Sequence, residues 1–203
     1  MLKRHLRQLV AAFLMLTIVS WPVLAIDAGG DAFEYFPLKV QNYWAYKVSL
    51  PDNKVYSQIV LVNSKSGQDI RTVVFINQIP QMEVVYKLNE QGLFRTKQIS
   101  AEGVNTLKPM QTVLPFKLAL DSVWSWEASE GPGEETAKVV RVEKVTVPAG
   151  TFEALLVKYE GIFNDGAAYS EMTWFVKGVG YVKAVTTIGG TTITKELLEY
   201  NVI

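Results

Sequence analysis

Apolar and polar residues alternate along most of this chain, and turn-forming residues interrupt the alternation at short intervals. Trp44, Tyr46 and Val48 are separated by single residues, and Met82, Val84, Tyr86 and Leu88 repeat the pattern. A period of two is that of a β-strand, whose successive side chains face opposite sides of a sheet. Long stretches with the helical period of 3.6 residues do not occur. The chain is therefore predicted to be all-β and antiparallel.

The alternating segments predict about ten or eleven strands. The first five form a meander over residues 44–50, 56–62, 70–76, 82–88 and 93–99. The later ones cover residues 123–128, 136–147, 151–163, 171–176, 181–187 and 191–200. Asn164-Asp165-Gly166 is the best hairpin signal between them. A short terminal helix over residues 195–200 is the alternative to the last strand, but the threonines before it favour the strand.

The segment from Val104 to Leu120 breaks this rhythm. Pro109 and Pro115 each lack an N–H and restrict the preceding residue, so they are expected to interrupt a helix or a ladder. We therefore expect one long irregular connection here, and long connections often carry function. Its apolar residues are expected to plug the open side of the sheet or to form a lid over it: Leu114, Phe116, Leu118 and Leu120.

A large antiparallel sheet without long helices has to cover its own apolar face. The prediction is a strongly curved sheet or a partly open barrel, with a two-layer β-sandwich as the alternative. A weak internal echo divides the domain at about residues 35–103 and 114–203. Trp44 matches Trp124 at an offset of 80 residues, and Glu83 matches Glu171 at an offset of 88. Two β sequences can match this well by chance, so duplication stays open.

The N-terminal residues 1–25 have the pattern of a secretory signal peptide. Lys3, Arg4 and Arg7 precede an apolar run, and Val23-Leu24-Ala25 supplies the small side chains that a signal peptidase accepts. The apolar run is short for a membrane span. No Cys lies at the cleavage point, so we expect no lipid anchor there. The expected product is a single exported domain, residues 26–203, in the periplasm or outside the cell.

Charge argues against nucleic-acid binding. Without residues 1–25 the chain keeps 17 Lys and Arg against 20 Asp and Glu. A protein that binds a phosphate backbone needs a concentrated positive face, and no basic run follows residue 25.

The residue inventory restricts catalysis. The chain has no Cys, and its one His is His5, inside the expected signal peptide. Imidazole and thiol acid–base or nucleophilic chemistry and ordinary zinc or haem sites therefore lack their side chains. Carboxylates remain, and their strand positions are typical of a solvated face: Glu127, Glu134, Glu135, Glu160 and Glu171. We expect no enzyme, metal or cofactor, with a carboxylate-dependent hydrolase as a weaker alternative.

The aromatic residues are the other candidates for function. They recur at strand alternation and are first expected in the core: Trp44, Tyr46, Trp124, Trp126 and Trp174. A curved sheet can also keep part of an apolar concave face for a guest molecule. The predicted ligand site combines these five residues with Leu114, Phe116 and Leu118. The predicted function is binding of a lipid, an acyl chain or another apolar molecule; an interaction or assembly factor of the cell envelope is the alternative.

Three motifs resemble those of a group of uncharacterised bacterial envelope proteins, many of them secreted or lipid-anchored. They are residues 35–46 (YFPL, then NYWAY), residues 147–153 (VPAGTFE) and residues 174–182 (WFVKGVGYV). The resemblance runs from about Tyr35 to the end and implies an all-β envelope domain similar in shape to the half-barrels of periplasmic lipoprotein carriers. It implies no catalytic residues. The chain departs from the anchored members in lacking a Cys at the cleavage site.

Overall fold

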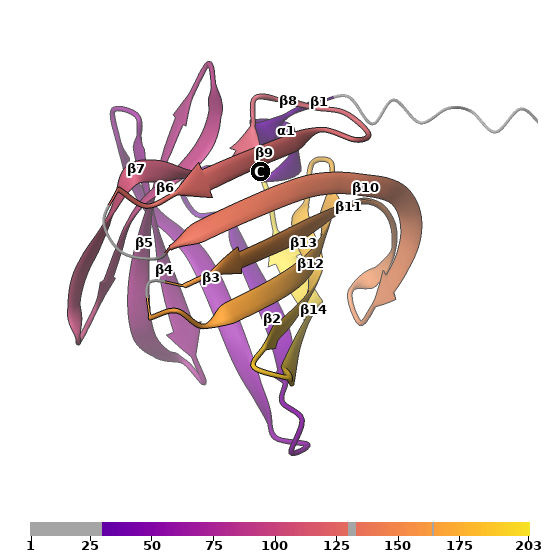
Figure 1. Ribbon diagram of the computed structural model, residues 1–203. Helices are drawn as coiled ribbons and strands as arrows, with labels where there is room; N and C mark the ends of the chain where they lie inside the picture. Colours follow the sequence, from indigo (N-terminus) through magenta and orange to yellow (C-terminus); the bar gives the residue numbers. More distant parts are fainter. Residues whose placement is uncertain (1–29, 130–132, 164) are drawn as a thin grey trace, which may run out of the picture.

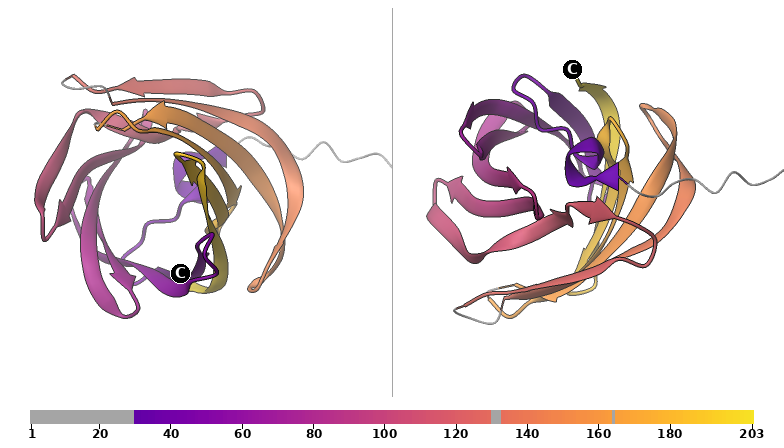
Figure 2. Two further views of the ribbon diagram at one scale, coloured as in Figure 1. Left: turned by 60° about the horizontal axis from the view of Figure 1, so that its bottom comes forward. Right: turned by 90° about the horizontal axis from the view of Figure 1, so that it is seen from above.

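The computed structural model describes residues 30–129, 133–163 and 165–203, and the expected signal peptide lies outside them. Twelve strands form one antiparallel sheet that curls into a nearly closed barrel (Figures 1 and 2). These strands are β2 (Tyr43–Ser49), β3 (Val55–Ser66), β4 (Asp69–Ile76), β5 (Ile79–Asn89), β6 (Gly92–Ser100), β7 (Gly103–Pro115), β9 (Val123–Glu127), β10 (Glu134–Val147), β11 (Gly150–Ile162), β12 (Ala168–Val176), β13 (Gly180–Ile188) and β14 (Thr191–Asn201). Two short strands, β1 (Gly30–Asp31) and β8 (Lys117–Leu118), pair with each other.

The sheet is an up-and-down meander closed by its first and last strands. Apart from β7 and β9, each strand pairs with its neighbour in sequence, and β14 returns to pair with β2, where Leu197 faces Tyr46 and Tyr200 faces Trp44. The prediction of an all-β, strongly curved or partly open barrel is confirmed, and the sandwich alternative is not the fold. The expected count of strands was low, because residues 104–115 were not expected to form one.

The barrel is incomplete between β7 and β9, which form no ladder with each other. Their contact is made instead by side chains of β9 that donate to carbonyls of β7. The indole N–H of Trp124 donates to the Thr112 carbonyl at 3.2 Å, and that of Trp126 donates to Pro109 at 2.8 Å. One backbone bond, from Ser129 N–H to the Lys108 carbonyl, adds to them at 2.7 Å. We call this line of contacts the seam.

A short segment that the sequence did not predict closes one end of the barrel. Helix α1 (Ala32–Tyr35) is only four residues long, and a capping box between Asp31 and Glu34 satisfies its first turn. Phe36 follows the helix and lies among the aromatic rings of this end. Its centroid is 5.4 Å from Trp44, 5.9 Å from Tyr86 and 5.8 Å from Tyr181. We call α1 and Phe36 the plug, and the opposite end the mouth.

The turn between β12 and β13 holds the plug in place. The N–H of Gly178 donates to the Glu34 carbonyl at 2.7 Å, and the indole of Trp44 donates to the Val179 carbonyl. Gly180 has φ +111°, and a Cβ there would come within 2.9 Å of the Trp44 indole nitrogen. Glycine is therefore required at this position both by conformation and by the close approach of the indole.

The expectation of an irregular connection over residues 104–120 was wrong for most of its length. Residues Gly103–Pro115 form β7, and only the remainder leaves the sheet. Prolines are tolerated because β7 is an edge strand, where a missing N–H costs no ladder bond. Pro109 also lies in a bulge, since Arg95 pairs with Gln111 while Lys97 pairs with Thr106.

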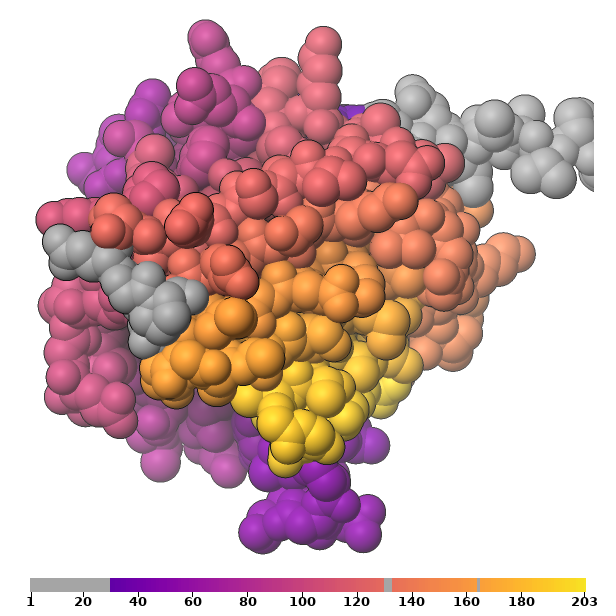
Figure 3. Space-filling model, viewed as in Figure 1, coloured from indigo at the N-terminus to yellow at the C-terminus, as the bar shows by residue number. Residues whose placement is uncertain are grey.

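The hairpin of β10 and β11 extends beyond the barrel and curls over β14 (Figure 1). The N–H of Ala149, in its turn, donates to the Leu197 carbonyl at 2.9 Å, and Phe152 lies edge-on to Tyr200 at 6.4 Å. The outer face of this part of the sheet is thereby covered, which buries Ala154 and Leu156. In the space-filling view the wall from β9 to β14 is continuous (Figure 3).

Among the described residues, no helix has both the length and the apolar character needed to cross a bilayer.

Candidate functional site

The barrel encloses a cavity of about 280 Å³ that reaches from the plug toward the mouth. Near the plug its walls are aromatic and aliphatic: Phe36, Val60, Val74, Val84, Phe175 and Tyr181. Further toward the mouth polar residues join the apolar Met82 and Phe163 in the walls: Gln58, Arg95, Gln98, Glu135, Tyr169, Glu171, Thr173, Thr186 and Lys195. We call this the inner cavity. Its polarity changes along its length, which suits an elongated molecule with one apolar end.

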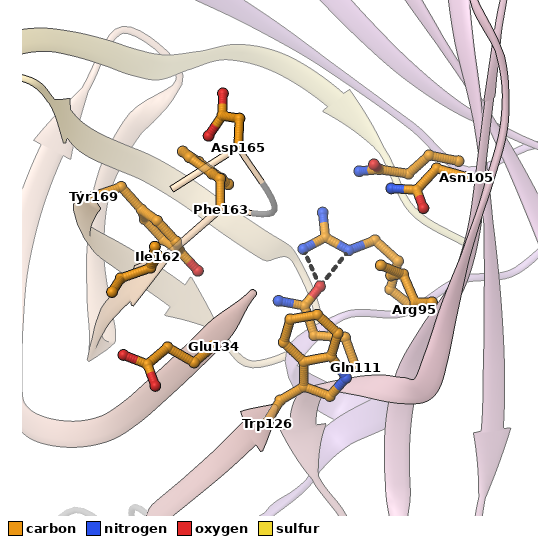
Figure 4. Close-up of a pocket in the computed structure, with 11 residues that line it drawn as sticks. Arg95, Asn105, Gln111, Trp126, Glu134, Ile162, Phe163, Asp165 and Tyr169 are labelled. Atoms are coloured by element: carbon orange, nitrogen blue, oxygen red, sulfur yellow. Dashed lines mark hydrogen bonds between the residues drawn. The ribbon is translucent and has the colours of Figure 1, made fainter. Parts of the chain in front are cut away.

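A second cavity of about 410 Å³ opens at the mouth (Figure 4). One wall comes from β6 and β7, with Arg95, Gln98, Asn105, Leu107 and Gln111; the other comes from β10 to β12, with Glu134, Ile162, Phe163, Asp165 and Tyr169. Trp126 of β9 lies between the two walls. We call this the mouth cavity. It shares Arg95, Gln98, Phe163 and Tyr169 with the inner cavity, so the two cavities are adjacent.

Paired polar side chains surround the passage between the cavities. Arg95 and Gln111 are direct partners across β6 and β7, and the Arg95 guanidinium donates twice to the Gln111 side-chain oxygen (Figure 4). On the opposite wall the Tyr169 hydroxyl donates to the Glu135 carboxylate. The Arg95 charge and the Gln111 amide both act on the Glu135 carboxylate, so the two pairs meet across the interior of the barrel.

Glu135 is the most buried of the carboxylates, with 8% of its surface exposed. Burial raises its pKa, while the Tyr169 hydroxyl, the Arg95 charge and the Gln111 amide oppose this rise. Glu135 thus carries a desolvation penalty that its neighbours only partly offset.

Glu171 is held by two threonines. Its carboxylate accepts from Thr173 at 2.8 Å and from Thr186, on the adjacent β13, at 2.7 Å. Nearby, the side-chain oxygen of Gln58 is buried and has no hydrogen-bond partner among the described residues. The polar half of the inner cavity therefore contains satisfied groups and one free acceptor.

Tyrosines provide neutral hydroxyls along the interior. Burial raises the pKa of Tyr46, Tyr159, Tyr169 and Tyr181 well above the ordinary tyrosine value, so these phenols stay protonated at all physiological pH values. The Tyr46 ring stacks on Tyr181 at 4.6 Å, and its hydroxyl donates to the Tyr181 carbonyl at 2.9 Å. These two contacts anchor the Tyr181 ring, which forms part of the cavity wall at the apolar end.

Two of the aromatic residues predicted for the ligand site lie beneath the plug. Trp44 and Tyr46 are fully buried on the inner face of β2 and line neither cavity. Their hydrogen bonds to Val179 and Tyr181 fix the plugged end of the barrel. The structure gives them a packing role.

The tryptophans of β9 lie on the inner face near the seam, on one face of the strand as predicted. Trp126 lines the mouth cavity, whereas Trp124 packs edge-on against Tyr159 at 6.1 Å. Trp174 is on the outer face of β12, where its indole N–H donates to Glu143 at 2.8 Å and Lys183 lies 5.7 Å from its ring. The structure therefore does not bring Trp174 together with the others.

The aliphatic members of the predicted site separate in the same way. Leu114 and Leu118 are buried in the core, and Phe116 is 38% exposed at the surface. None of the three lines the inner or the mouth cavity. Leu118 pairs with Gly30 in the small sheet beside the plug, so this part of the chain covers the closed end.

Sequence reasoning missed the polar residues that line the passage. Carboxylates in strands were expected on a solvated face; Glu127, Glu134 and Glu160 are exposed, but Glu135 and Glu171 face the interior. The sequence signal that could have revealed this is the strand alternation: Glu135 lies on the same face of β10 as Ala137 and Val139, which are buried. The same alternation argument applies to Arg95, Gln111 and Tyr169. A barrel wide enough to contain a cavity admits polar residues on its inner face.

Within the described part of the chain, no group of three or more His, Cys, Asp or Glu residues is arranged to hold a metal ion.

No protein-family model matches the chain, and no curated protein matches it in sequence. Among solved structures it is similar to a lipoprotein candidate from Parabacteroides distasonis, with 13% identity, a TM-score of 0.47, and coverage of 82% of this chain and 98% of the other. It is also similar to an exported-protein candidate with a YmcC-like fold from Bacteroides fragilis, with 13% identity, a TM-score of 0.41 and coverage of 80% and 96%. A β-barrel-like protein of the domain of unknown function DUF1849 from Brucella abortus matches at 12% identity, a TM-score of 0.41 and coverage of 81% and 99%.

Proposed function

We propose that this protein is an exported, non-catalytic binding protein that holds an acyl chain or a similar apolar group inside its barrel. The observation that supports this most is the inner cavity, which is apolar at the plug and polar toward an open mouth. Export rests on the signal-peptide pattern of residues 1–25.

The size of the space fits this role. The inner cavity, of about 280 Å³, adjoins the mouth cavity, of about 410 Å³, and small-molecule pockets range from roughly 300 to 1,000 Å³. The wall near the plug offers mostly aliphatic and aromatic surface. An acyl chain in this position gains about 0.8 kcal/mol for each CH₂ removed from water.

The side chains of the passage support binding rather than turnover. Each carboxylate at this level is engaged: Glu135 by Tyr169 and Glu171 by Thr173 and Thr186. Glu134 and Glu135 are adjacent in one strand and so point to opposite faces, an arrangement that cannot place two carboxylates across one bond.

A cavity-filling variant tests the proposal. Ala184 lines the inner cavity on β13 and is 4% exposed, so Ala184→Leu places three additional carbon atoms in the space that the acyl chain would occupy. Uptake of a fluorescent fatty acid should be saturable in the wild type and at least tenfold weaker in the variant. Ala101→Leu, in the exposed turn between β6 and β7, is the matched control and should bind like the wild type.

Overpacking a core costs about 1–3 kcal/mol, so circular dichroism and thermal unfolding must first show that Ala184→Leu is folded. Native mass spectrometry of gently purified wild-type protein gives a second readout. No uptake of the probe by the wild type, together with no co-purified lipid, would contradict the proposal.

A further inference from the structure

The mouth cavity carries chemistry that an acyl chain does not use. Its walls hold planar groups that together offer donors and acceptors: the guanidinium of Arg95, the amides of Gln98, Asn105 and Gln111, and the carboxylate of Asp165. A site whose only task was to admit an apolar chain would not need this many polar groups around one opening. The set is suited to a head group with several hydrogen-bonding atoms.

Aromatic faces lie among these polar groups. Phe163 stacks on Tyr169 with ring centroids 4.3 Å apart, and this pair forms part of one wall. Trp126 lies between this wall and the opposite one, with its N–H occupied by the Pro109 carbonyl (Figure 4). Since the indole N–H is used at the seam, Trp126 can offer a guest only its ring. The C–H faces of a sugar ring pack on such surfaces while its hydroxyls reach the polar groups around them.

The charges at the mouth do not match an ionic head. Arg95 lines both cavities, and its guanidinium donates to the neutral Gln111 while Glu135 lies within its electrostatic reach. A carboxylate or phosphate placed on Arg95 would meet the buried carboxylate of Glu135. A cationic head would be repelled by Arg95. The carboxylates of Glu134 and Asp165 would attract it only weakly, because they are exposed and therefore screened by salt. A neutral head avoids both conflicts.

We infer that the mouth cavity binds a neutral, polyhydroxylated head group, such as a sugar, whose apolar tail enters the inner cavity. This inference rests on the proposed function and specifies the class of ligand. Hydroxyl groups both donate and accept, so they match a wall that mixes amides, a guanidinium and carboxylates. The aromatic surface of Trp126 and of the Phe163–Tyr169 pair supplies the contact for the sugar ring.

The test uses four probes below their micelle concentrations: decyl maltoside, decanoate, decyltrimethylammonium and free maltose. Isothermal titration calorimetry of the wild type should give at least tenfold tighter binding of decyl maltoside than of either ionic decyl probe. Free maltose should bind more weakly than decyl maltoside because it lacks the tail.

Substitutions at Asn105 and Trp126, with one control at Asn201, localise the head group. Asn105→Leu removes an exposed amide of the mouth and should weaken decyl maltoside at least fivefold while leaving decanoate unchanged. Asn201→Leu makes the same change at an exposed position of β14, outside both cavities, and should bind all probes like the wild type. Trp126→Phe keeps an aromatic face and should retain more affinity for decyl maltoside than Trp126→Leu.

The outcomes separate the two proposals. If the three decyl probes bind equally, or an ionic probe binds most tightly, the sugar-like head is wrong and the acyl-binding function is supported. If no decyl probe binds the wild type, both are wrong. Tight decyl maltoside binding that is unchanged in Asn105→Leu and in both Trp126 variants also contradicts the assignment of this site.

Discussion

Glu135 illustrates what the barrel does to a single carboxylate. It is buried on the inner face of β10, where desolvation disfavours its anion, and the Tyr169 hydroxyl and the Gln111 amide are its hydrogen-bonding neighbours. Because burial raises its pKa, the folded protein holds the Glu135 proton more tightly than the unfolded chain does. The charged form of Glu135 therefore weakens folding above the folded-state pKa, and protonation relieves this as the pH falls.

Glu135→Gln should be at least as stable as the wild type at pH 7–8, because the amide keeps an acceptor for Tyr169 without a buried charge. The advantage should shrink as the pH falls through the raised folded-state pKa toward the ordinary value of 4.5, since the wild type then becomes neutral at this site. Urea unfolding between pH 8 and pH 4 measures this. Glu134→Gln, at the exposed neighbouring position, is the control for loss of a carboxylate. A variant that is less stable by the same amount at every pH would contradict the prediction.

At the level of elements, the seam is where the barrel depends on side chains instead of a ladder. Trp124 contributes an indole N–H to Thr112 and an edge-on contact to Tyr159. Trp124→Ala should lower the free energy of unfolding by about 3 kcal/mol, at the low end for such truncations because the residue is only half-buried. Trp124→Phe should cost about 1 kcal/mol, mainly the lost hydrogen bond.

Chemical denaturation of the two Trp124 variants gives both values, and acyl-probe binding to the folded variants shows whether the residue also serves the ligand. Trp124 lines neither cavity, so the folded Ala variant should bind the probe nearly as the wild type does. Unchanged stability with lost binding would instead place Trp124 at the ligand.

The elements also show where sequence reasoning succeeds. The meander from β2 to β6 was predictable, because alternation and turn residues are local signals that agree with the fold. Strand β7 was not, because its prolines are acceptable only at an edge, and the strand order that makes it an edge is not a local property. Helix α1 has four residues, too few for a helical period. The interior position of Glu135 and Arg95 depends on the width of the barrel, which no strand specifies alone.

The whole molecule is built as two successive six-stranded meanders, β2–β7 and β9–β14, that meet at the β2–β14 ladder and at the seam. The sequence echoes fall on corresponding strands of these halves: Trp44 on β2 and Trp124 on β9, Glu83 on β5 and Glu171 on β12. This placement is what a duplication would produce, and duplication remains a prediction. The two halves nevertheless share one interior, because each contributes one wall of both cavities. We therefore do not expect them to behave as independent domains.

Residues 30–116 and 117–203, expressed separately, should therefore each fail to fold cooperatively. Each fragment would expose the apolar inner face of its strands and would lose the β2–β14 ladder, and the first fragment would keep the plug without Tyr181 and the β12–β13 turn that hold it. Mixing the fragments should restore a single unfolding transition, seen at the same denaturant concentration by circular dichroism and by tryptophan fluorescence. A cooperative transition in either isolated fragment would show instead that a six-stranded half can close its own core, and that the two cavities lie between separately stable units.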